Sequence, residues 1–157
     1  MNKKNEENIC LDILLFELED KQTYGINVLR IREIIKKNKI NKIPKSDKNI
    51  IGVISFRDKI VPVLKLYQFL EIKISEKEDN DNGFIIISEC ENKNFGLTVK
   101  SVKNIVHINF NDLLDVPENI GEKHYLDSVI NLNGKIIQIL DIKKIIYNQN
   151  KQLRAKI

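Results

Sequence analysis

Short apolar stretches alternate with polar clusters along the whole chain, and this pattern predicts a protein built mainly of β-strands. The stretches are rich in isoleucine and valine and end at glycine, asparagine, aspartate or lysine. The predicted strands are Cys10–Leu18, Tyr24–Val28, Arg32–Lys36, Gly52–Phe56, Lys59–Leu64, Gly83–Cys90, Phe95–Val99, Asn104–Ile108, Leu126–Leu132 and Lys135–Leu140. Short helical segments are expected at Lys65–Leu70 and Asp141–Tyr147, the second with Asp141 as its N-cap.

The chain also contains an internal repeat. Residues 24–35 and 95–106 share an aromatic residue, a glycine, an aliphatic residue and a valine, followed by aliphatic residues at the same spacings. Residues 53–66 align without a gap on residues 129–142. A unit of about 70 residues buries little surface alone, so we predict two five-stranded barrels packed on one another.

Each barrel is expected to come from one half of the chain. We predict a single domain over residues 9–147, with barrels at about 9–74 and 83–147. The acidic, asparagine-rich stretch Ser75–Asn82 is the expected linker. The polar residues 1–8 and 148–157 are expected to be frayed tails.

The two repeated hairpins differ at their turns. Asn133-Gly134 in the second hairpin suits a two-residue turn, because both central residues need a positive φ. Arg57-Asp58 stands at the same place in the first hairpin. Arginine gains nothing from this backbone conformation, so Arg57 is predicted to have another role.

Composition narrows the class of protein. The 157 residues are 42% hydrophobic and 31% charged with a net charge of +4, which is typical of a folded domain. The positive charge is mostly lysine scattered between acidic residues, which indicates a solvated surface. No apolar run approaches the roughly 20 residues of a membrane-spanning helix. Cys10 and Cys90 form no CxxC, so we expect buried thiols in the cytoplasm.

Few residues are suited to catalysis. The sequence has two histidines, His107 and His124, and lacks HExxH, GxSxG, GxGxxG and P-loop motifs. No set of histidine, cysteine and carboxylate residues has the spacing of metal ligands. We therefore predict no enzymatic activity, no metal and no cofactor, and an ordinary structural or surface role for His107.

Three segments together resemble the CheW-like domain family of bacterial chemotaxis, over about residues 10–147. They are Tyr24–Ile35, then Ile43-Pro44 with Ile51–Val63, then Phe95–Val106 with Tyr125–Ile146. The resemblance implies two packed SH3-like barrels. It also implies a non-catalytic adaptor in arrays beneath the inner membrane, coupling the cytoplasmic tips of transmembrane chemoreceptors to the regulatory domain of the histidine kinase CheA. Membrane association is then expected only through the receptors.

The resemblance places partner contacts in two segments. The residues after Tyr24-Gly25 fall where the family docks the kinase or its partners, and Arg57 matches the arginine of the family's usual Asn-Leu-Arg-Gly turn. Three of the four arginines lie in these segments, and arginine suits planar interface contacts. The predicted partner-binding residues are Val28, Arg30, Ile31, Arg32, Glu33, Gly52, Phe56, Arg57 and Asp58.

Other interpretations remain open. Val28 and Ile31 also suit core positions, Glu33 suits a local surface pair, and Arg57 suits an exposed turn. A basic barrel that binds nucleic acid, although not expected, would need exposed aromatic side chains on one sheet face. A CheV-type scaffold would carry a receiver domain, for which the residues after Tyr147 leave no room. An enzyme would need a polar pocket that no motif indicates.

Overall fold

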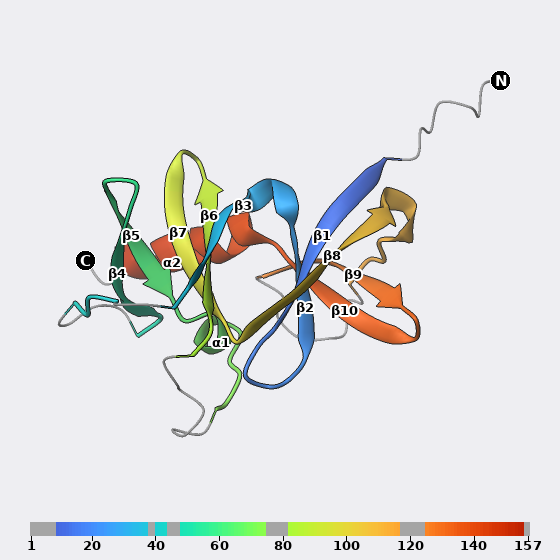
Figure 1. The fold of residues 1–157 in the computed structure, drawn as a ribbon, viewed down its shortest axis with the longest axis horizontal. Coiled ribbons are helices and arrows are strands. Elements are labelled where there is room, and N and C mark those ends of the chain that lie inside the picture. The colour runs from blue at the N-terminus through green and yellow to red at the C-terminus, as the bar shows by residue number, and fades with distance from the viewer. Residues whose placement is uncertain (1–8, 38–39, 44–47, 75–81, 117–124, 156–157) are drawn as a thin grey trace.

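The computed structural model describes residues 9–37, 40–43, 48–74, 82–116 and 125–155, and it confirms the ten strands (Figure 1). The strands are β1 Cys10–Glu17, β2 Thr23–Asn27, β3 Ile31–Lys36, β4 Ile50–Phe56, β5 Lys59–Leu64, β6 Phe84–Cys90, β7 Lys93–Val99, β8 Ser101–Asn109, β9 Leu126–Leu132 and β10 Lys135–Leu140. The helices are α1 Leu66–Phe69 and α2 Ile142–Ala155, with the short 3-10 helices η2 Val28–Arg30 and η4 Phe110–Asp112. Neither described α-helix is long and apolar enough to cross a bilayer.

The strands form two five-stranded sheets, but each sheet takes strands from both halves of the chain. Sheet A has the order β8-β1-β2-β10-β9, and sheet B has the order β3-β6-β7-β5-β4. The expected assignment of one barrel to residues 9–74 and the other to 83–147 is therefore wrong. The β1–β2 hairpin lies in the barrel that the second half completes, and the β6–β7 hairpin lies in the other.

The chain crosses from one sheet to the other at equivalent points of the two copies of the repeat, after β2 and after β7. After β2, η2 carries the chain out of sheet A, and β3 pairs with β6 in sheet B. After β7, Lys100 leads directly to β8, which pairs with β1 in sheet A. The Lys100 amide donates a hydrogen bond to the Glu17 carbonyl, 2.9 Å away, at this crossing. The two halves are thus connected by main-chain hydrogen bonds in both sheets.

An isolated bridge closes each sheet into a barrel: sheet A forms barrel A, and sheet B forms barrel B. Asn41, beyond β3, exchanges two main-chain hydrogen bonds with Val53 of β4, and Leu114 does the same with Val129 of β9. Val53 and Val129 are equivalent positions of the repeat. Gly52 lies beside the first bridge, where a Cβ atom would collide with the Asn41 carbonyl. Its missing side chain is what lets the strands approach there.

Three clusters of buried side chains explain the continuous apolar runs. In β1, Ile13 and Leu15 point into the core of barrel A, whereas Leu14 and Phe16 point into the cluster between the barrels. In the same way, β6 directs its residues alternately into barrel B and into the shared cluster. Both faces of these strands are buried, so the sequence shows an apolar run instead of alternation. The shared cluster packs the two barrels together.

The expectation of a frayed tail from residue 148 is wrong, because α2 continues to Ala155. Ile142, Ile145 and Gln149 are buried along one face of the helix, at helical spacing. The Gln149 Oε1 accepts a hydrogen bond from the Asn49 side-chain amide over 3.2 Å. As expected, Asp141 caps the start of α2, accepting a hydrogen bond from the Lys144 amide. Residues 1–8, 75–81 and 156–157, named as tails and linker, lie outside the described residues.

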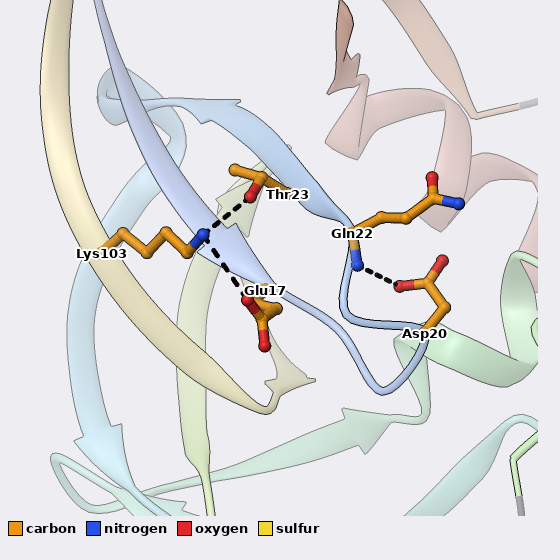
Figure 2. Close-up of polar contacts among 5 residues, drawn as sticks. All are labelled: Glu17, Asp20, Gln22, Thr23 and Lys103. Carbon is orange, nitrogen blue, oxygen red and sulfur yellow. Dashed lines mark hydrogen bonds and ion pairs between the residues drawn. The ribbon is translucent and has the colours of Figure 1, made fainter. Parts of the chain in front are cut away.

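Polar contacts fix the β1–β2 hairpin and its neighbour β8 (Figure 2). The Lys103 ammonium donates to the Thr23 hydroxyl at 2.9 Å and pairs with the Glu17 carboxylate at 3.5 Å. In the turn, Asp20 accepts hydrogen bonds from the Gln22 amide and the Tyr24 hydroxyl. Burial, together with this carboxylate, raises the pKa of Tyr24 above its usual range. The hairpin therefore joins sheet A through side chains as well as main chain.

The expectation of two buried thiols is only half correct. Cys90 is buried, but Cys10 is exposed. Cys10 is the first residue of β1, and continuous burial in that strand begins at Ile13. The buried part of β1 therefore does not extend to its first residue.

We predict that Gly52→Ala lowers the free energy of unfolding by about 2 kcal/mol or more, because the new methyl group collides with backbone that cannot move aside. The control is Ser128→Ala, at the equivalent position of barrel A, where about 1 kcal/mol or less should be lost. Urea unfolding followed by circular dichroism measures both. Equal effects of the two substitutions would contradict the role given to Gly52.

Candidate functional site

The β4–β5 turn holds Arg57 in a conformation that arginine does not favour. Its φ is 49° and that of Asp58 is 61°, so both central residues of the turn are left-handed. Asn133 and Gly134 adopt the same kind of turn between β9 and β10, with φ of 52° and 86°. The two hairpins therefore share one backbone shape, and only the second has the residues that suit it.

Two predicted site residues lie beside Arg57 and orient it. Its guanidinium Cζ lies 5.1 Å from the centroid of the Phe56 ring, within the range of a cation–π contact. An Nη atom lies 3.7 Å from the Glu33 carboxylate on β3. The Arg57 side chain is still 72% exposed. We call Glu33, Phe56 and Arg57 the Arg57 cluster; it combines residues from both predicted segments.

The stability of the turn does not explain why an arginine stands at position 57. A left-handed conformation costs an L-residue other than glycine or asparagine roughly 1–2 kcal/mol. An exposed ion pair returns about 0–1 kcal/mol, and an exposed cation–π contact about 0.5–1 kcal/mol. The contacts at best offset the cost, and asparagine at this turn would avoid it. The turn is thus stabilised no better by Arg57 than by the asparagine of the other copy.

A second exposed feature was missed by the sequence analysis. Leu29 in η2 has 87% of its surface exposed. The Asn27 side chain accepts a hydrogen bond from the Leu29 amide over 3.0 Å and so caps η2. The equivalent residue of the second copy is Lys100, which is also exposed. The available signal was a leucine at a position where the other copy has a lysine.

The remaining predicted residues lie in different environments. Val28 and Ile31 pack against the cluster between the barrels, which favours the core interpretation. Gly52 is buried at the closing bridge, and Phe56 is 9% exposed in the barrel B core, so neither offers a contact surface. Arg32 is exposed and pairs with Glu89 on β6. Arg30 and Asp58 are exposed.

The described residues contain no group of three or more histidine, cysteine, aspartate or glutamate side chains that could hold a metal ion. His107 is exposed and pairs with Asp12 on the neighbouring strand β1, which confirms a surface role. His124 lies outside the described residues. Burial, together with the negative charge of Glu71, raises the pKa of Tyr125.

Comparison with known proteins finds similarity to proteins of bacterial chemotaxis. A family model described as CheW-like domain matches residues 12–150. The chain is 32% identical to a chemotaxis protein CheW from Thermotoga maritima over 137 residues, which covers 86% of this chain and 87% of that protein. It is 29% identical to chemotaxis protein CheV3 from Helicobacter pylori, covering 78% of this chain but 40% of that protein.

The fold also matches a solved structure. The crystal structure of the scaffolding protein TtCheW from Thermoanaerobacter tengcongensis superposes with a TM-score of 0.79 at 25% identity. The match covers 87% of this chain and 92% of that chain. The predicted architecture of two packed five-stranded SH3-like barrels is thereby confirmed.

We predict that Arg57→Asn leaves the free energy of unfolding unchanged or raises it by up to about 1 kcal/mol, because asparagine tolerates a positive φ. The reciprocal substitution Asn133→Arg should lower the free energy of unfolding by about 1 kcal/mol. Urea titrations of both variants and the wild type measure these changes. A loss of more than about 1 kcal/mol in Arg57→Asn would show that the Arg57 contacts stabilise the turn after all.

Proposed function

The chain belongs to the CheW-like domain family, and from this membership we propose that it is a chemotaxis adaptor that couples transmembrane chemoreceptors to the histidine kinase CheA. The observation that carries the proposal is the match of the CheW-like model to residues 12–150, together with the two-barrel fold. The protein is not an enzyme, in keeping with a family of scaffolding proteins. It would work in the cytoplasm, at receptor arrays under the inner membrane.

The exposed groups fit a role in orientation and affinity. Arg57, with Glu33 beside it, presents a planar donor on a rigid hairpin and would orient the regulatory domain of CheA. Leu29 would contribute apolar contact area, while Arg30 and Asp58 lie on the same two exposed segments. The positive φ of Arg57 supports this proposal, because the residue is kept at a position that favours asparagine.

The other interpretations receive less support. The exposed aromatic side chains Phe110 and Tyr147 lie on η4 and α2, whereas single-stranded nucleic acid needs aromatic groups together on a sheet face. The chain is 32% identical to the CheW relative and 29% identical to the CheV3 relative, so a CheV-type scaffold is not the better match. The adaptor is therefore the better-supported function.

We predict that Arg57→Asn weakens binding of the purified chain to the CheA regulatory domain about tenfold or more, because the planar donor is lost while the turn is kept. Leu29→Lys, which installs the residue of the other copy, should weaken binding to the kinase or to receptor tips. The control is Asn133→Ser, at the equivalent turn of barrel A, with affinity within about twofold of wild type.

Isothermal titration calorimetry measures these affinities, with circular dichroism as a check of folding. Equal affinity of wild type and Arg57→Asn would overturn the role of Arg57. Failure of the wild-type chain to bind either the CheA regulatory domain or a receptor would overturn the adaptor function itself.

A further inference from the structure

A groove of about 430 Å³ opens between β5 and β7 in barrel B. These strands run parallel, and their pairing covers Val63–Gly96 and Leu64–Leu97. Closer to the turns the strands diverge, so the tips of the β4–β5 and β6–β7 hairpins stand apart in Figure 1, and α2 passes behind the strands below these tips. The volume lies in the range of roughly 300–1,000 Å³ that is typical of ligand pockets.

Comparison with the other copy shows why the groove is there. In sheet A, the equivalent parallel pairing of β10 and β2 includes one further residue pair, Gln138–Tyr24. Pro62 occupies the position equivalent to Gln138. Proline has no N–H and cannot donate a ladder hydrogen bond, so pairing ends before Pro62 in sheet B. The shorter pairing in sheet B leaves β5 and β7 unpaired before Val63 and Gly96, where the groove lies.

The groove has apolar walls and a basic rim. Pro62, Phe95 and Ile50 line its apolar part. Lys59 and Lys93 lie near the turns of the two hairpins and are exposed. Among the described residues that line it there is no carboxylate. The groove therefore favours a ligand that carries both apolar and acidic groups.

The buried side chain of Gln149 provides a second, independent observation. Gln149 lines the groove from α2 and is 1% exposed. Its Oε1 is bonded to Asn49, but its Nε2 has no hydrogen-bond partner. A buried donor without a hydrogen-bond partner carries a free-energy cost, because it has lost its hydrogen bonds to water. A ligand with a carbonyl or carboxylate oxygen at this end of the groove would remove that cost after a small rotation of the amide.

We propose that the groove binds an extended acidic segment of a partner protein, which lies between β5 and β7 as an added strand. Its main chain would pair with the parts of β5 and β7 that diverge, and its carboxylates would contact Lys59 and Lys93. Its alternate side chains would lie against Pro62 and Phe95. Arg57 reaches Glu33 on the other side of the β4–β5 hairpin, so this site is separate from the proposed adaptor contact.

The probe is a fluorescein-labelled octapeptide of alternating glutamate and valine, titrated with the full chain at low salt. Lys59→Glu, Lys93→Glu and Pro62→Gln are each expected to weaken binding about fivefold or more. The matched control is Lys135→Glu, at the position equivalent to Lys59 in the other hairpin, which should stay within about twofold. An octapeptide of alternating lysine and valine should not bind. Amide shifts in nuclear magnetic resonance should map to residues 59–61, 63–64 and 93–95.

Several results would overturn the proposal. They are no binding of the acidic octapeptide by the wild type, an equal loss in Lys135→Glu, or amide shifts confined to sheet A. A dimer of the wild type in sedimentation, abolished by Pro62→Gln, would show that a second copy occupies the groove instead. Arg57→Asn should keep its affinity for the octapeptide, so failure here is distinguishable from failure of the adaptor function. The lysine variants keep the test decisive if Pro62→Gln does not fold.

Discussion

The exchange of strands between the two halves is the constraint on which the rest of the structure depends. Each barrel needs the two-stranded hairpin of one half and three strands of the other, so neither half can complete its main-chain hydrogen bonds alone. The cluster of side chains between the barrels adds apolar contact to this connection. The barrels therefore form one body, and surfaces on both of them keep a fixed relative position, as an adaptor between two partners requires.

The features to which we assign binding roles lie where the two copies of the repeat differ. The copies share strand order, barrel closure and hairpin shape, which are set by the packing that both need. Arg57 replaces Asn133 at a turn, Pro62 replaces Gln138 in a parallel ladder, and Leu29 replaces Lys100 before a crossing strand. Each difference keeps the strand order of the barrel and alters what the surface presents. A duplicated scaffold can thus carry different contacts on its two halves.

The sequence predicted the strands because alternation and β-branched runs report burial directly. It did not predict the exchange, because a repeat is equally compatible with pairing inside a half and pairing across halves. Gly52 and Phe56 were predicted as partner contacts together with Arg57, and only the three-dimensional structure shows that both are buried. The length of α2 was missed because Gln149, a buried position beyond Tyr147, is polar. Leu29 was missed because the two copies of the repeat share no residue type at that position.

Equilibrium unfolding in urea, followed residue by residue with nuclear magnetic resonance, tests most directly whether the barrels are one body. The amide signals of Gly25 in sheet A and Gly96 in sheet B serve as probes of the two sheets. Because each sheet contains strands of both halves, the two signals should disappear with the same midpoint and the same slope. If one sheet kept its native signals at urea concentrations where the other had lost them, the barrels would be independent and the account would be contradicted.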